Sequence, residues 1–384
     1  MANLKSPSIT IAFIEKAASA IERGERGIVM LVLRDAAAAN GVKTYTIRDV
    51  SGVPTDLTAT NQQYIKDALK GYTNAPFKVL AYVMPVAGEN DAEVYKAMFE
   101  YLATAKFHWL AVPTVETDTK TDDVISWVKT QRDNSNMVKA VLPNADSADN
   151  EGIINWASTL TKITTTVGGD GATATTKTAY TPEQCTARIA GLLAGTASTI
   201  SATYAPLADF DDVDRLDKDA RDDAVGKGKL IAFWDGEKVK LNRAVTSFVT
   251  TNDTKSDSFK KIKLVENMDM IKSDIQATIE DSYIGKYANS YDNKCLLITA
   301  INGYFMELVN EGIIESGSTE IDIESQRTYL VKRGKDVVID GVSYKPADLT
   351  DEQVKVANTD SHVFLKSTVV LLDAIEDVTL RIFV

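Results

Sequence analysis

The segment Ile28-Val-Met-Leu-Val-Leu33 is a continuous apolar run, and it decides the fold class of the first half of the chain. A continuous apolar run is typical of a strand that is buried on both faces, whereas a strand with one solvent-exposed face alternates apolar and polar residues. Similar runs follow at Lys78–Met84, Trp109–Val112 and Val138–Leu142. Segments with the apolar spacing of helices lie between them, at Gln62–Leu69, Ala92–Ala105 and Asp122–Thr130. Buried strands that alternate with helices predict an α/β domain with a mostly parallel, helix-covered sheet.

We expect this α/β domain to extend over residues 27–228, with a change of character inside it at residues 146–210. The threonine- and glycine-rich stretch Thr159–Thr181 predicts a loop or an irregular hairpin, with a turn at the Gly-Gly-Asp-Gly sequence 168–171. Pro182 then opens a helix that ends near Leu193, with Thr181 as its N-cap.

Residues 229–374 predict a second unit, of the α+β class. It opens with a hairpin signal, Asp235-Gly236, between two apolar segments, and Lys261–Val265 is ambiguous between a strand and the start of a helix. Two long helices are expected, with apolar faces formed by Met268, Ile271, Ile275 and Ile279 and by Leu297, Ile301, Tyr304 and Leu308. The remaining expected elements are strands at Tyr329–Val331, Val337–Ile339 and Val363–Leu372 and a helix at Asp351–Ala357.

Both ends of the chain have the period-2 pattern of a strand. Residues 1–26 do not resemble the start of a globular domain, and within them Ile9, Ile11 and Phe13 alternate with polar or small residues. At the other end, residues 375–384 place Val378, Leu380, Ile382 and Val384 on one face. Each end either pairs within its own domain or adds as a strand to a neighbouring copy of the chain.

Composition restricts the classes of partner. The chain has 384 residues, 44% of them hydrophobic, and 42 Lys and Arg against 54 Asp and Glu give a net charge of −12. This acidic balance argues against nucleic acid or an anionic membrane, because both bind clustered Lys and Arg. No apolar run approaches the ~20 residues of a membrane span, and no secretory signal is visible, so we expect a soluble protein without membrane insertion.

The sequence also offers little chemistry. No glycine-rich phosphate loop follows the predicted parallel strands, where an α/β enzyme would bind its ligand. His108 and His362 each begin a predicted strand and are interpreted as core or interface residues. The acidic run Asp209–Asp219 lacks the glycine that a calcium loop needs at its sixth position, which favours a solvated face. Cys185 and Cys295 allow at most one disulfide, which favours a reducing compartment. We therefore predict no catalytic residue, no cofactor and no metal.

Several blocks resemble the sheath proteins of contractile phage tails, especially those of Gram-positive bacterial phages and phage-tail-like bacteriocins. The resemblance covers about residues 1–60 and 229–384. It is carried by the opening segment 8–29 and by Leu241-Asn-Arg-Ala-Val-Thr-Ser, Ile271-Lys-Ser-Asp-Ile, Asp281-Ser-Tyr-Ile-Gly-Lys, Asn289-Ser-Tyr-Asp-Asn-Lys and Ala300-Ile-Asn-Gly-Tyr-Phe. The chain departs from the family at Pro7-Ser8, where such arms often read Pro-Gly, and in its short length, which suggests little or no outer decorating domain.

The resemblance implies a structural subunit rather than an enzyme. Copies would form stacked six-subunit rings around a tail tube, and contraction would drive the tube through a target cell envelope. Terminal arms of two neighbours would complete a sheet in a third subunit. The implied partners are further copies, the tube protein, and the baseplate and tail terminator proteins, in a particle assembled in the bacterial cytoplasm.

The lysines at 260, 261 and 263 are dense enough to predict a tube-facing patch, with a solvated face as the simpler interpretation. Two rival functions stay open at this point. One is an α/β enzyme with an unrecognised site, and the other is a static shell or surface-layer subunit.

Overall fold

A computed structural model describes residue 21 and residues 24–167 and 173–383. The described residues form two compact units, each with its own core. The sheet unit contains residues 24–273 and 371–383, and the helical unit contains residues 274–370 with Ile21. The units therefore divide at residue 274 rather than at the expected residue 229, because residues 229–273 pack with the sheet.

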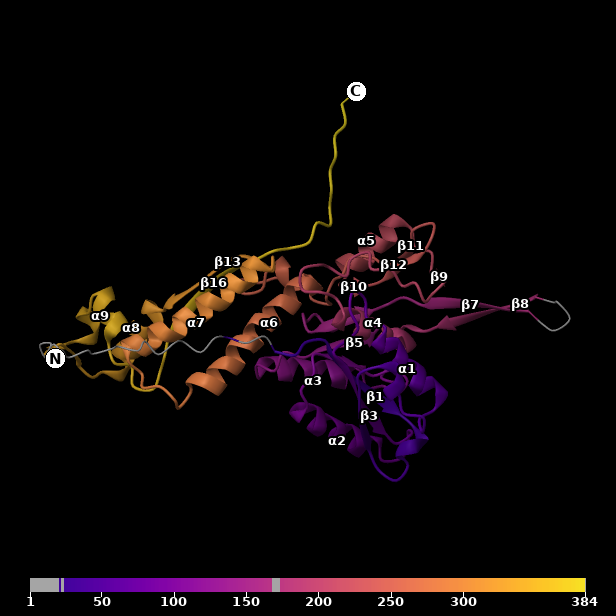
Figure 1. The fold of residues 1–384 in the computed structure, drawn as a ribbon, viewed down its shortest axis with the longest axis horizontal. Helices are drawn as coiled ribbons and strands as arrows, with labels where there is room; N and C mark the ends of the chain where they lie inside the picture. The colour runs from indigo at the N-terminus through magenta and orange to yellow at the C-terminus, as the bar shows by residue number, and fades with distance from the viewer. Residues whose placement is uncertain (1–20, 22–23, 168–172, 384) are drawn as a thin grey trace, which may run out of the picture. The chain divides into compact units, whose positions relative to one another are not determined.

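The sheet unit is built on a seven-stranded sheet with strand order β10-β6-β5-β4-β1-β3-β2. Figure 1 labels β1, β3, β5 and β10 of this sheet. Its strands are β1 (Ile28–Arg34), β2 (Lys43–Ile47), β3 (Lys78–Met84), β4 (Trp109–Ala111), β5 (Lys139–Pro143), β6 (Ile153–Trp156) and β10 (Lys229–Leu230). All neighbours are parallel except β2, which pairs antiparallel with β3. The mostly parallel sheet predicted from the apolar runs is confirmed.

Helices cover both faces of this sheet. Val29, Leu31 and Leu33 pack in one core cluster with residues of α1 (Ala59–Leu69) and α4 (Pro182–Ala194). Ile28, Met30 and Val32 pack in the other cluster with residues of α2 (Asp91–Thr104) and α3 (Thr121–Asp133). Successive side chains of a strand point to opposite faces, so a strand covered on both sides must be apolar at every position. All six residues of the deciding run are at most 1% exposed.

The region predicted as a loop or irregular hairpin is a regular hairpin. β7 (Leu160–Val167) and β8 (Thr173–Tyr180) pair antiparallel over their full length, and β7 also pairs with β9 (Asp212–Val213). Threonine is β-branched and favours strands, and this preference outweighs the polar, loop-like composition. The turn predicted at 168–171 lies outside the described residues. Beyond β8, Thr181 caps α4 with a full capping box, as predicted.

The expected hairpin at Asp235-Gly236 joins β11 (Ala232–Trp234) and β12 (Val239–Leu241). The acidic stretch that precedes it is only partly a solvated face. Asp217 caps α5 (Lys218–Gly226), and Asp209 pairs with Lys70 and Arg188.

Two long helices follow. The first, α6 (Ile262–Thr278), continues as a π-helical turn at Ile279–Tyr283, which resolves the ambiguous Lys261–Val265 in favour of a helix. Its predicted apolar face is only partly buried, whereas its polar residues Asn267, Asp269 and Asp274 are at most 3% exposed. The second, α7 (Tyr291–Asn310), buries the predicted stripe of Leu297, Ile301, Tyr304 and Leu308.

In the helical unit, α7 packs against β13 (Ile314–Ile321), which pairs with β16 (Leu365–Leu371) in a two-stranded sheet. A smaller core of Leu330, Val337, Leu349, Val354 and Ala357 joins α8 (Ile323–Arg333), the hairpin of β14 (Val337–Ile339) and β15 (Val342–Tyr344), and α9 (Asp351–Val356). The predicted strands at 337–339 and 363–372 and the helix at 351–357 are confirmed, the last two with slightly shorter bounds.

The predicted strand Tyr329–Val331 is wrong, because these residues lie in α8. Asp322 caps this helix at its start, and Gly334, with φ +69°, ends it in the left-handed conformation that glycine adopts readily. Among the described residues, no helix combines the length and the apolar character that a bilayer span requires.

Candidate assembly site

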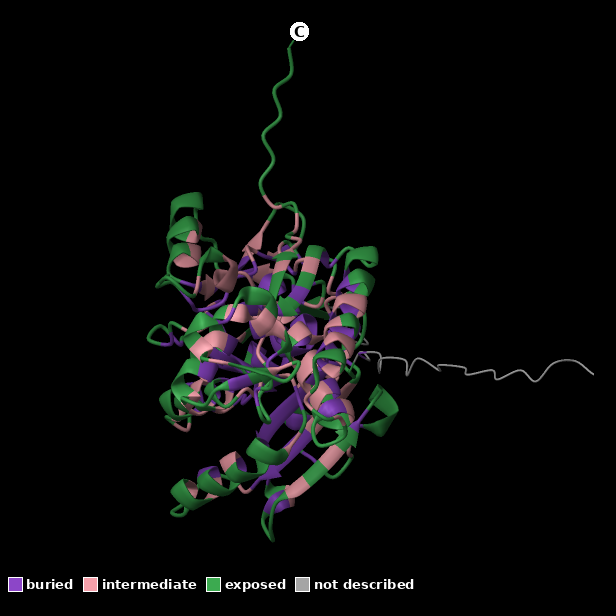
Figure 2. Ribbon diagram, turned by 90° about the vertical axis from the view of Figure 1, so that its left-hand side faces the viewer, coloured by how far each residue is buried: buried purple, intermediate pink, exposed green. Residues whose placement is uncertain are grey.

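The chain continues beyond β16 as an extended segment, and its last described residues expose apolar side chains. Val378, Leu380 and Ile382 are 78%, 76% and 76% exposed, and Phe383 is 90% exposed. Figure 2 draws this whole stretch as exposed. Residues 372–383 pair with no strand in the described part of the chain. Residues 378–383, the C-terminal extension, therefore have the predicted alternation of apolar side chains but no partner strand among the described residues.

Just before this extension, one carboxylate is turned inward. The Glu376 side chain is 5% exposed, and its Oε1 accepts hydrogen bonds from the hydroxyls of Thr203 at 2.6 Å and Ser201 at 3.1 Å. Its Oε2 lies 3.3 Å from Lys261 Nζ and 3.8 Å from Arg243 Nε. All these residues belong to the sheet unit. The residues just before the extension, which we call its root, are thus bound to the body of the sheet unit through the buried carboxylate of Glu376.

Two exposed carboxylates on the same segment reinforce this contact. Lys261 also pairs with Asp373, and Arg243 donates to Asp377 at 2.5 Å. Burial lowers the pKa of Lys261, but Asp373 and Glu376 raise it by more, so it stands above its ordinary value. The hydrogen bond to Asp377 likewise raises the pKa of Arg243. Both cations stay charged and paired at any physiological pH.

A second feature is the open two-stranded sheet of the helical unit. β16 is largely exposed, with Lys366, Ser367, Thr368 and Val370 all in contact with solvent. β13 is different, because the Asn302 side chain on α7 accepts from the N–H of Thr319 at 2.7 Å and donates to its C=O at 3.3 Å. No third strand pairs with this sheet within the described ranges. The outer edge of β16 therefore presents main-chain groups that no strand among the described residues pairs with.

The other predicted contact residues fall into two groups. Ile9, Ile11, Phe13 and Val384 lie outside the described residues. The lysines do not share one exposed patch: Lys260 pairs with Asp257, Lys261 binds the root of the extension, and Lys263 is 7% exposed. Burial lowers the pKa of Lys263. A tube-facing role for these lysines stays a prediction.

A network of buried charges joins α6 to the sheet. Asp269 accepts two hydrogen bonds of 2.9 Å from Arg132 and one of 2.8 Å from Lys139, which also pairs with Glu266. The opposite charges of Lys139 and Arg132 hold the pKa of Asp269 below its ordinary value against the effect of burial. Every charge in this network has a partner, which is the condition under which buried ions are stable. Its role is structural.

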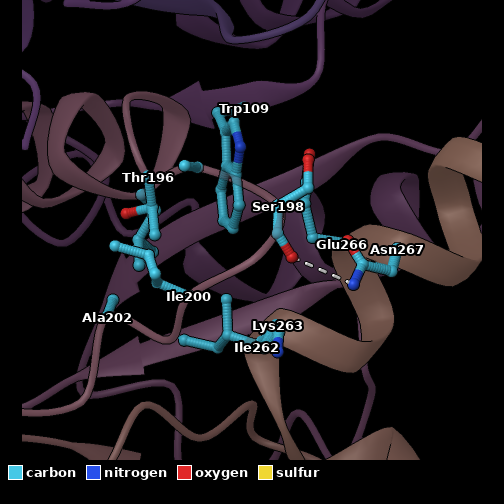
Figure 3. Close-up of a pocket in the computed structure, with 11 residues that line it drawn as sticks. Trp109, Thr196, Ser198, Ile200, Ala202, Ile262, Lys263, Glu266 and Asn267 are labelled. Carbon is cyan, nitrogen blue, oxygen red and sulfur yellow. Dashed lines mark hydrogen bonds between the residues drawn. The ribbon is translucent and has the colours of Figure 1, made fainter. Parts of the chain in front are cut away.

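Beside this network lies a small cavity of about 20 Å³, lined by Trp109, Lys263, Asn267 and neighbouring residues (Figure 3). The Asn267 side chain donates to the carbonyl of Ser198 at 3.2 Å, the dashed line in Figure 3. Trp109 Nε1 and Asn267 Oδ1 are buried without a hydrogen-bond partner. The cavity has room for about one water molecule, which could bind such groups, and is too small for a nucleotide or a sugar.

The residues considered for catalysis occupy structural positions. The Nδ1 atom of His108 accepts from the N–H of Ile28 at 3.3 Å, and burial lowers its pKa to about 4. His362 is exposed rather than in a core, and its ring forms an aromatic cluster with the rings of Tyr329 and Phe364. Cys185 and Cys295 are both free. Within the described ranges, no group of His, Cys, Asp and Glu side chains could hold a metal ion.

Sequence reasoning missed the four residues that bind Glu376. Thr203 and Glu376 are 173 positions apart. Arg243 lies in a block that carries the family resemblance and Lys261 in the predicted lysine patch, but neither pattern indicates a contact with Glu376. Three carboxylates, Asp373, Glu376 and Asp377, stand ahead of the apolar alternation, and this composition is that of an ordinary polar linker.

Comparisons with known proteins agree with the family resemblance. The profile of the phage tail sheath protein central domain matches residues 88–247, and that of the phage tail sheath C-terminal domain matches residues 254–384. The tail sheath protein of Clostridium phage phiCD119 is 34% identical over 382 residues, which cover 98% of each chain. The chain belongs to the phage tail sheath family. The resemblance noted in the sequence is thereby confirmed.

Solved structures share the fold. The sheath tail protein of Desulfitobacterium hafniense has a TM-score of 0.63 at 16% identity, covering 95% of this chain and 100% of that one. The contracted helical sheath of the anti-feeding prophage has a TM-score of 0.65 at 13% identity, covering 99% of each chain. At these identities the likeness establishes a common mixed α/β sheath fold.

Proposed function

We propose that this chain is the repeating subunit of a contractile tail sheath, without catalytic activity. Copies form six-subunit rings that stack around a tail tube, and contraction of the stack drives the tube through a target cell envelope. The single observation that carries this proposal, beyond family membership, is the exposed apolar C-terminal extension, with Val378, Leu380 and Ile382 each more than three-quarters exposed. Such a segment is unfavourable in water and calls for a partner surface.

In this proposal the extension of one copy adds as a strand to the β16 edge of another. Strand addition supplies main-chain hydrogen bonds, and alternate side chains supply apolar contacts. The β16 edge is favoured over the β13 edge because Asn302 already occupies the main-chain groups of Thr319. The N-terminal arm, with Ile9, Ile11 and Phe13, contributes a second such strand.

The energy for contraction is stored during assembly rather than taken from a nucleotide. The extended sheath is metastable and the contracted one buries more surface, so that contraction is a one-way shift between two states of the same subunits. The terminal arms keep neighbouring subunits connected while the rings slide and rotate. Contacts to the tube are numerous and individually weak, because they must break together.

The remaining partners follow from the same role. They are the tube protein, the baseplate and the tail terminator, in a phage tail or a phage-tail-like particle assembled in the bacterial cytoplasm. Lys260 is the best placed of the three lysines for a tube contact, because its partner Asp257 is a highly exposed carboxylate, whereas Lys261 binds the segment before the extension and Lys263 is buried.

Electron microscopy of purified chain, with and without tube protein, tests this proposal. A contractile sheath gives hollow tubes with two helical lattices, one extended on the tube and one contracted without it. A single lattice under both conditions would favour a static shell subunit, and small discrete particles at every concentration would contradict polymerisation altogether.

A further inference from the structure

The segment that links β16 to the C-terminal extension alternates between half-buried residues, at Leu372, Ala374 and Glu376, and exposed ones. Ile375 is 89% exposed and the Asp377 side chain 81% exposed, yet the Glu376 side chain between them is 5% exposed. Successive side chains of an extended segment point in opposite directions, so the segment can turn one residue inward and expose its neighbours. The residue turned inward here is the charged one, while the apolar Ile375 stays in water.

The surface that receives Glu376 is built in advance. Thr203 Oγ1 accepts from the N–H of Ala244 at 3.0 Å, which holds the hydroxyl in place. Val245 forms a β-bridge with Lys261, so the segments that carry Arg243 and Lys261 are also joined by main-chain contacts. Three separate parts of the sheet unit thus converge on one carboxylate. None of these main-chain contacts involves the extension itself.

Burying a carboxylate is unfavourable unless charged and hydrogen-bonding groups replace its water. A linker that lies in solvent does not need a buried carboxylate. A linker that must leave the sheet unit at one defined point needs a contact that fixes it there. We propose that Glu376 is a positioning residue, which anchors the root of the C-terminal extension so that the chain is free to move only beyond Asp377. This inference rests on the proposed strand addition and identifies the residue that directs it.

The anchor sets how far the extension can reach. Ile382 lies five residues beyond Asp377 but eleven residues beyond Leu371. At about 3.3 Å per residue, Ile382 lies within about 17 Å of Asp377 while the anchor holds. After release, the chain is fixed only as far as Leu371, and Ile382 can lie up to about 36 Å from that residue. The effective concentration of a tethered segment falls as about the −3/2 power of its length, so release should lower it about threefold.

Distance measurement between spin labels tests the anchor in the single chain. Labels at Leu380→Cys and Glu237→Cys, in a Cys295→Ser background, report on the extension relative to a body loop, below the concentration at which copies assemble. We expect Glu376→Ala to broaden the distance distribution at least twofold. Ile375→Ala is the matched control: it shortens the neighbouring side chain, which is 89% exposed, and should leave the distribution nearly unchanged.

Assembly gives the second readout. Without labels, Glu376→Ala should raise the concentration needed for polymerisation about threefold or more, while Glu376→Gln, which keeps the hydroxyl contacts, should restore part of the loss. Lys261→Met removes the cation that pairs with Glu376 and should also raise the concentration needed for polymerisation. Circular dichroism must show an unchanged fold in each variant.

An unchanged distance distribution in Glu376→Ala would overturn the anchor. A broadened distribution with an unchanged assembly threshold would overturn the claim that the anchor positions the extension for strand addition. Absence of polymerisation in the unmodified chain would instead contradict the proposed function. The spin-label result would still report on the anchor in that case, so the two failures are distinguishable.

Discussion

Val378→Ala is the substitution whose effect can be worked out most directly. The change removes two carbon atoms from a side chain that is 78% exposed in the single chain. Each buried CH₂ contributes about 0.8 kcal/mol, so burying this exposed share in a neighbour contributes about 1.2 kcal/mol. Losing it should raise the critical concentration for polymerisation about eightfold. The free energy of unfolding of the single chain should not change, because Val378 has no place in its core.

The critical concentration is measured by sedimenting polymers over a range of total concentrations. Val338→Ala is the matched control, since it is the same substitution at a residue that is 66% exposed in the β14–β15 hairpin. The reasoning is refuted if both variants shift the critical concentration equally, or if Val378→Ala leaves it within twofold of the unmodified chain. A lower melting temperature for Val378→Ala alone would also count against it.

Three further predictions concern the fold. Asp269→Asn leaves Arg132 and Lys139 poorly paired in the interior and should lower the free energy of unfolding by about 3–5 kcal/mol, measured by urea denaturation. His108 has a folded-state pKa of about 4, below the ordinary value of 6.5, so the unfolded chain binds its proton first as pH falls. Stability should therefore decrease between pH 6.5 and pH 4, by up to about 3 kcal/mol, and His108→Gln should remove this component of the pH profile. Thr181→Ala removes the N-cap of α4 and should cost about 1 kcal/mol in thermal denaturation.

The sequence predicted the elements whose burial follows a regular period. The run Ile28–Leu33 could only be a strand covered on both faces, and the helical stripe of α7 is buried as expected. The secondary structure of short or compositionally unusual segments was harder to predict. The threonines at 164–166 were predicted to lie in a loop or an irregular hairpin but belong to the regular strand β7. Tyr329–Val331 was predicted as a strand but lies in α8, although Asp322 and Gly334 mark the ends of that helix.

The candidate assembly site was predictable only in its local part. The alternation from Val378 onward is visible in seven consecutive residues, and it identified the extension. The anchor was not visible, because Ser201, Thr203, Arg243 and Lys261 come together with Glu376 only after the sheet unit has folded. A contact between residues 115 to 175 positions apart, as these are from Glu376, leaves no periodic pattern in a single sequence.

The central claim is that the C-terminal extension joins one subunit to the next rather than completing its own fold. Negative-stain electron microscopy of the full chain beside a chain ended at Asp377, with circular dichroism of both, tests it most directly. We expect hollow tubes or stacked rings from the full chain and none from the shortened one, with identical spectra. Equal assembly by both chains, or loss of the fold on shortening, would contradict the claim.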